Sequence, residues 1–262
     1  MASRQFSSIK ALILDMDGVL WRGDQPIGDL PANFAEMERR GLKVTMATNN
    51  STQDADQYIE KLAGFGVTVN RWQIINSSEA TAIYLKQRFP EGGTIYAVGE
   101  KGLLNSLSEY GFYPGEENVL AVVAGMDRQL TYTKLCQAAM FIRAGAPFIG
   151  TNADRTFPTP LGLVPGAGAV LAALETATDV KPLIIGKPAP EMYRVALERL
   201  KMTPEQTLVI GDRLETDIVG AQSLGCLTGL VLSGVTSEPQ AREWRPAPDL
   251  IADDLANMLQ QF

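Results

Sequence analysis

Residues 9–18 of the 262-residue chain read IKALILDMDG, an apolar run that ends in two acids and a glycine. The run has the length and composition of a strand buried on both faces. Because side chains alternate along an extended segment, Asp15 and Asp17 are expected to point the same way. In open α/β folds, ligands bind beyond the carboxyl ends of the strands. Two like charges there indicate a divalent metal, a shared proton or both, although the tetrapeptide alone is better explained as an Asp/Gly turn.

Composition limits the chemistry that this chain can perform. A hydrophobic content of 45% over 262 residues can bury a large core in one or two domains. The formal charge of −7 and the lack of a basic run argue against a nucleic-acid partner. The chain has no histidine, so Ser-His-Asp and Cys-His mechanisms are excluded and proton transfer must use carboxyl, Lys or Tyr groups. Cys136 and Cys226 lie in apolar surroundings, as reduced core residues do, and a structural zinc site is excluded.

No targeting or membrane signal is visible in the sequence. Residues 1–8 hold no apolar run of signal-peptide length, and no apolar stretch of 18 residues occurs. We therefore expect a cytoplasmic enzyme without a membrane partner.

Strand and helix patterns alternate along most of the chain. Outside the middle segment, helical patterns separate strand candidates at residues 10–14, 43–47, 73–75, 183–185, 207–210 and 228–232. Strands separated by helices predict parallel pairing in a doubly wound, Rossmann-like α/β sheet. Between residues 90 and 181 the alternation restarts, with Pro/Gly-rich or polar junctions at both ends. We interpret residues 90–181 as a smaller α/β domain inserted into a core made of residues 1–89 and 182–262; one continuous sheet is the alternative.

Polar residues follow four of the expected core strands. They are Asp15 and Asp17 after the first, Thr48, Asn49 and Asn50 after the second, Lys187 after residues 183–185, and Asp212 and Asp217 after residues 207–210. Each group alone is typical of a helix cap or a solvated surface. Their common position after strands favours one shared site.

Together these residues indicate phosphoryl transfer. Three converging acids suit Mg²⁺, which takes oxygen ligands. The metal and Lys187 would neutralise a phosphate that the carboxylates repel. One Asp can attack phosphorus to give an aspartyl-phosphate, and a second Asp can protonate the leaving alcohol.

These motifs resemble the haloacid dehalogenase-like (HAD) hydrolase superfamily. The resemblance covers nearly the whole chain and points to subfamily IIA, the p-nitrophenyl-phosphatase and NagD-like branch with a large α/β cap. It is carried by the motifs DMDGVLW (15–21), TNNS (48–51), GTN (150–152), PGAG (165–168), GKP (186–188) and GDRLETDI (211–218).

The resemblance implies roles for the site residues. Asp15 would be the nucleophile and a metal ligand, and Asp17 the acid/base and a metal ligand through its backbone carbonyl. Asp212 would complete the protein ligands of Mg²⁺, and Asp217 would orient Lys187 or metal-bound water. A separate set would hold or lie near the phosphate oxygens: Thr48, Asn49 and Lys187, with Asn50 close by.

The inserted segment would be the cap that covers the phosphate and sets the substrate, a small phosphorylated metabolite. In the relatives it often carries the contact of a homodimer. Phe157 occupies the position where pyridoxal-phosphate phosphatases place a histidine before a proline. Its ring can stack on a substrate but cannot offer the same hydrogen bond; packing inside the cap is its ordinary role.

The leading hypothesis is a Mg²⁺-dependent phosphomonoesterase. A phosphotransferase or phosphomutase would use the same aspartyl-phosphate, and a catalytically weak phosphometabolite-binding module would keep the same residues. Dehalogenation has no use for the acid at Asp17.

Overall fold

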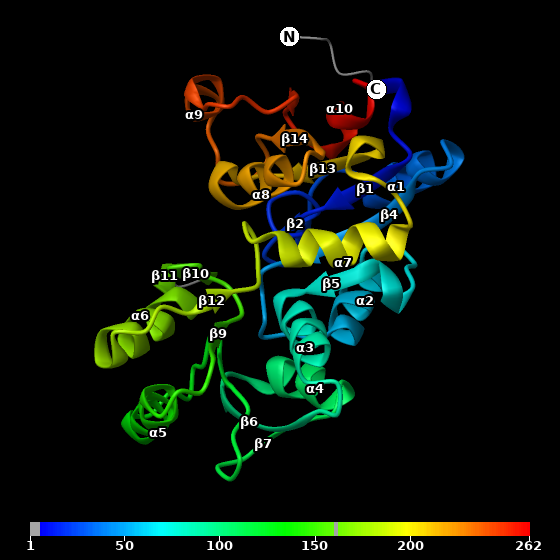
Figure 1. The fold of residues 1–262 in the computed structure, drawn as a ribbon. Coiled ribbons are helices and arrows are strands. Elements are labelled where there is room, and N and C mark those ends of the chain that lie inside the picture. Colours follow the sequence, from blue (N-terminus) through cyan, green and yellow to red (C-terminus); the bar gives the residue numbers. More distant parts are fainter. Residues whose placement is uncertain (1–5, 160–161) are drawn as a thin grey trace. The chain divides into compact units, whose positions relative to one another are not determined.

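The computed structural model of the chain describes residues 6–159 and 162–262, which form two compact units (Figure 1). The first unit is drawn from Met1–Thr48, Asp56–Ile75 and Met192–Phe262. The second is drawn from Asn49–Ala55 and Asn76–Glu191. Each unit has its own parallel sheet.

The sheet of the first unit is parallel and six-stranded, with the order β15-β14-β13-β1-β4-β5. Its strands are β1 (Ala11–Leu14), β4 (Lys43–Thr48), β5 (Ile74–Asn76), β13 (Thr207–Gly211), β14 (Leu227–Val231) and β15 (Leu250–Ala252). The side chains of β1 are fully buried, as its uninterrupted apolar run predicts. This confirms the expected α/β class with a Rossmann-like parallel sheet.

Helices connect these strands and flank the sheet (Figure 1). They are α1 (Leu30–Arg39), α2 (Ala55–Gly64), α7 (Pro190–Leu200), η4 (Leu214–Ile218), α8 (Val219–Ser223), α9 (Glu238–Glu243) and α10 (Leu255–Leu259). Helix α1 begins at a cap in which the Asp29 carboxylate accepts a hydrogen bond from the Ala32 N–H at 3.0 Å. A short hairpin, β2 (Trp21–Arg22) and β3 (Gln25–Pro26), follows the first acids.

The second unit contains a parallel five-stranded sheet of order β12-β9-β8-β6-β7. Its strands are β6 (Gly93–Val98), β7 (Phe112–Pro114), β8 (Val122–Ala124), β9 (Phe148–Gly150) and β12 (Leu183–Ile184). Its helices are α3 (Ser77–Arg88), α4 (Lys101–Glu109), α5 (Tyr132–Arg143) and α6 (Ala167–Thr178). The antiparallel hairpin β10 (Thr156–Thr159) and β11 (Gly162–Pro165) lies between β9 and α6 in the chain.

One strand expectation is wrong. Residues 183–185 were expected in the same sheet as β1, yet β12 pairs with β9, with Leu183 opposite Ile149. A two-residue edge strand with a half-exposed Leu183 has no burial pattern to assign it to either sheet. The second unit thus also contains α3 and the segment that carries Lys187. We keep the division into a core and a cap at residues 90 and 181 as a proposal.

Two further expectations concern membrane-spanning segments and the two cysteines. Within the described residues, no helix combines the length and the apolar character that crossing a membrane requires. Both cysteines are free thiols: Cys226 is buried and Cys136 is half-buried.

Candidate active site

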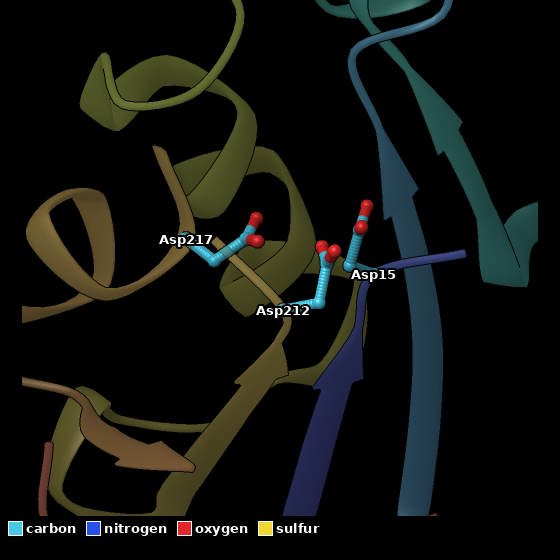
Figure 2. A group of neighbouring side chains, drawn as sticks. All are labelled: Asp15, Asp212 and Asp217. Atoms are coloured by element: carbon cyan, nitrogen blue, oxygen red, sulfur yellow. The ribbon is translucent and has the colours of Figure 1, made fainter. Parts of the chain in front are cut away.

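Three acids of the first unit meet at the carboxyl edge of its sheet. Asp15 follows β1, Asp212 follows β13 and Asp217 lies in η4. One carboxylate oxygen from each lies within 4.8 Å of the others (Figure 2). The parallel register explains the meeting, because Leu14 lies opposite Ile210 and the Asp15 N–H donates to the Ile210 carbonyl at 2.8 Å.

Asp212 is held by the loop between β14 and α9. Its side chain is buried, and its Oδ2 accepts a hydrogen bond from the Val235 N–H at 2.7 Å. A Cβ atom on Gly234 would lie 1.9 Å from that oxygen, and one on Gly18 would lie 2.5 Å from it. Gly18 also has a φ of +86°, which favours glycine. The two glycines therefore create the space that the Asp212 carboxylate occupies.

Asp217 is buried and held by its own turn. Its Oδ2 accepts from the Arg213 N–H at 3.0 Å, and its backbone carbonyl accepts from the Tyr193 hydroxyl at 3.2 Å. A Cβ atom on Gly211 would lie 2.3 Å from the Cβ of Asp217, so the close approach requires glycine. Figure 2 shows its carboxylate directed toward the other two. The sequence predicted only a supporting role for Asp217; the structure groups it with Asp15 and Asp212.

Asp17 lies outside this group of three. The expected alignment with Asp15 ends because β1 stops at Leu14 and the chain then turns, with the Leu20 N–H donating to the Met16 carbonyl at 2.8 Å. The exposed Asp17 carboxylate accepts a hydrogen bond from the Trp21 indole N–H at 2.9 Å. Its roles as acid/base and as a metal ligand through its carbonyl remain predictions.

Thr48 ends β4, beside β1, and is buried. Met46 pairs with Leu14, so Thr48 reaches the sheet edge at which Asp15 lies. Its predicted contact with phosphate remains a prediction.

The other predicted phosphate ligands belong to the second unit. Lys187 is buried, and its backbone carbonyl accepts from the Asn49 side-chain amide at 3.0 Å. The Asn50 Oδ1 accepts from the Thr52 N–H at 2.9 Å, which closes a turn. Phe157 is partly exposed in β10 and lies opposite Val164. That these residues lie near the acids of the first unit remains a prediction.

The three acids fit a divalent cation. They offer hard oxygen ligands within 4.8 Å of one another, the donor chemistry that Mg²⁺ and Ca²⁺ take in proteins. Two of the three are almost fully buried, and burying like charges together is costly unless a cation offsets them.

Two features of the site were not predicted from the sequence. The loop that carries Gly234 and Val235 orients Asp212, and a Ser-Gly pair directly after an apolar strand was its only signal. Trp21, which holds Asp17, lies inside the quoted motif at residues 15–21, and its side-chain contact becomes visible only in the folded hairpin.

Two family models match this chain. The model described as haloacid dehalogenase-like hydrolase matches residues 12–113, and the one described as HAD-hydrolase-like matches residues 184–258. The 5'-nucleotidase YutF of Bacillus subtilis is 33% identical over 250 residues, which span 95% of this chain and 97% of that protein. This chain belongs to the haloacid dehalogenase-like hydrolase family. As a HAD hydrolase it is an enzyme that acts on phosphate ester bonds.

Solved structures of HAD hydrolases share the whole fold. The 4-nitrophenylphosphatase of Thermotoga maritima has a TM-score of 0.92 at 31% identity, over 97% of this chain and 98% of that one. The glycerol phosphate phosphatase Rv1692 of Mycobacterium tuberculosis, solved in complex with magnesium, has a TM-score of 0.89 at 33% identity. It is matched over 97% of this chain and 77% of its own length. These relatives place the chain in the p-nitrophenylphosphatase-like branch of the family.

Proposed function

We propose that this HAD hydrolase is a Mg²⁺-dependent phosphatase that hydrolyses a small phosphomonoester through an aspartyl-phosphate. The observation that carries the proposal is the meeting of Asp15, Asp212 and Asp217 at one sheet edge, with oxygens within 4.8 Å of one another. Three acids alone would repel a phosphate, so the arrangement makes chemical sense with a divalent cation bound.

Asp15 would act as the nucleophile. A carboxylate oxygen of Asp15 attacks phosphorus while the bond from phosphorus to the ester oxygen breaks, which leaves the phosphoryl group on Asp15. Asp17 gives its proton to the departing alkoxide. It then takes a proton from the water that attacks the phosphoryl group, so phosphate leaves and Asp15 is restored. A Mg²⁺ ion held by Asp15, the Asp17 backbone carbonyl and Asp212, with Asp217 beside it, would offset the negative charge on the phosphoryl oxygens.

The relatives' names and the charge of the chain support a small substrate. The relatives are named for 5'-nucleotides, 4-nitrophenyl phosphate and glycerol phosphate, all small phosphomonoesters. A net charge of −7 disfavours polyanionic macromolecules. We propose a small soluble metabolite, a cytoplasmic location and a homodimer formed through the cap.

The test is phosphate release from 4-nitrophenyl phosphate with Mg²⁺ and with EDTA. We expect EDTA to abolish turnover and Asp15→Asn to lower kcat at least about a thousandfold, because an amide oxygen is a far weaker nucleophile toward phosphorus than a carboxylate. Asp24→Asn, which alters a fully exposed acid of the same unit, should keep wild-type turnover. Activity that survives EDTA or Asp15→Asn would refute the proposal. With an alcohol added, a dominant transfer product would identify a phosphotransferase instead.

A further inference from the structure

Both side-chain amide hydrogens of Asn49 are engaged within the second unit. Its Nδ2 donates to the Lys187 carbonyl at 3.0 Å and to the Asp154 Oδ1 at 3.2 Å. A side-chain amide nitrogen carries two hydrogens. Both donors of Asn49 therefore have protein acceptors, and the residue is more than nine-tenths buried.

The backbone of Asn49 is fixed as well. Its carbonyl accepts from the Ser77 hydroxyl at 2.6 Å and from the Asn152 amide at 2.7 Å, both buried side chains. A Cβ atom on Gly186 would lie 2.7 Å from the Asn49 Oδ1, so the chain before Lys187 passes directly against this amide. Asn49 thus contacts both the segment after β9 and the segment after β12.

Asp154 is itself held in place by the glycines of the PGAG motif. Its carbonyl accepts from the Gly168 N–H at 2.8 Å, and its N–H donates to the Asn152 Oδ1 at 3.1 Å. A Cβ atom on Gly166 would lie 2.5 Å from the Asp154 carbonyl oxygen, so the helix α6 begins in direct contact with this backbone. Because the main chain of Asp154 is fixed, its carboxylate is held in place to accept the hydrogen bond from the Asn49 amide.

We propose that Asp154 is a positioning residue: it fixes the Asn49 amide, which in turn fixes the backbone of the phosphate-binding Lys187. The side chain of Asn49 then serves as a clamp between two loops, and any contact of Asn49 with phosphate falls to its main chain. A carboxylate suits this position because a hydrogen bond to a charged acceptor is stronger than one to a neutral acceptor. The inference rests on the proposed function and on the predicted role of Lys187 as a phosphate ligand.

The test is calorimetric titration of inorganic phosphate into the whole protein with Mg²⁺. Asp154→Ala should weaken phosphate binding about tenfold. A displaced Lys187 would lose binding free energy equal to roughly one charge-assisted hydrogen bond to phosphate. Asp154→Asn can still offer Asn49 an oxygen and should stay within about threefold of the wild type. Asn49→Ala should resemble Asp154→Ala, and the double variant should be no worse than Asn49→Ala, since both act through one clamp.

A control removes a buried carboxylate elsewhere in the second unit. Asp127 accepts from the Lys134 ammonium at 2.7 Å and from the Gln129 N–H at 2.8 Å. Asp127→Ala should lower the melting temperature but bind phosphate as the wild type does. Equal weakening by Asp127→Ala would overturn the inference, because general loss of order would then explain both results.

Other results would also overturn it. A direct phosphate contact from the Asn49 side chain predicts that Asp154→Ala keeps its affinity while Asn49→Ala loses it. A wild type that fails to bind phosphate would remove the premise that Lys187 is held for it. Turnover of 4-nitrophenyl phosphate is measured in parallel: absent turnover with intact phosphate binding refutes the proposed function, and the affinities of the variants still decide the clamp.

Discussion

At the scale of single residues, glycines decide where the acids of the site lie. Gly18, Gly211 and Gly234 each pass so close to an aspartate that a Cβ atom would lie 2.5 Å or less from a side-chain atom. Those atoms belong to Asp212 and Asp217, and each of the two carboxylates is held in place by a backbone hydrogen bond. The absence of a side chain at these positions is part of how the acids are oriented.

Gly234→Ala should disrupt the site more than the fold. Its Cβ would lie 1.9 Å from the Asp212 Oδ2, so the carboxylate or the loop must shift. We expect kcat/KM for 4-nitrophenyl phosphate to fall at least about a hundredfold, since misplacement by about 1 Å has such an effect on positioned groups. Gly64→Ala is the control: it lies in α2, nothing lies within 4 Å of its added Cβ, and stability should rise by up to about 1 kcal/mol. Wild-type activity of Gly234→Ala would contradict this account.

At the scale of elements, strand pairing brings distant residues together and helix ends fix the loops beside them. The parallel pairing of β1 with β13 joins Asp15 to Asp212 across almost 200 positions of sequence. In the second unit, the start of α4 is tied to the loop after β8 by an ion pair. The Glu100 carboxylate accepts from the Arg128 guanidinium at 2.7 Å and from the Arg128 N–H at 3.0 Å.

This ion pair predicts a pH effect with a definite sign. The hydrogen bond from the Arg128 side chain lowers the pKa of Glu100 below its ordinary value, against the opposing effect of burial. Because the folded value is the lower one, its contribution to stability is present above the unfolded pKa and is lost as pH falls through the folded pKa. The contribution is at most about 0.5 kcal/mol, since Arg128 is mostly exposed to solvent.

An NMR titration of the Glu100 carboxyl checks this directly. In Arg128→Gln the pKa of Glu100 should return toward its ordinary value. Glu117→Gln, at an exposed acid of the same unit, should leave it lowered. An unchanged Glu100 titration in Arg128→Gln would show that another group holds the carboxylate.

At the scale of the whole molecule, the negative charge of the chain makes its folding stability depend on a bound divalent cation. The chain carries a formal charge of −7, and three of its acids converge in the first unit. Like charges so close disfavour the folded state until a cation offsets them. A ligand that binds only the folded chain stabilises it by mass action.

Mg²⁺ should therefore raise the melting temperature. At about 100 times the dissociation constant the gain is about 2.7 kcal/mol, or roughly 5 to 10 °C for a chain of this size. Differential scanning calorimetry with Mg²⁺, and with NaCl at equal ionic strength, measures the effect. Asp212→Asn should abolish the rise and Asp24→Asn should keep it; an equal rise in Asp212→Asn would place the cation elsewhere.

The apolar run of residues 9–14 and the helices between strands were enough to predict the parallel sheet. A strand that is buried on both faces is apolar along its whole length, so its local composition reveals it. The polar ends of those strands were enough to predict acids at one sheet edge. The membership of the acid group was decided only in three dimensions: the turn after Leu14 directs Asp17 to Trp21, while η4 brings Asp217 to Asp212. The sheet that receives β12 and the double engagement of Asn49 were likewise invisible in the sequence. Both depend on contacts between segments far apart in the chain, and a local pattern cannot encode which distant partner a short edge strand or a single amide will meet.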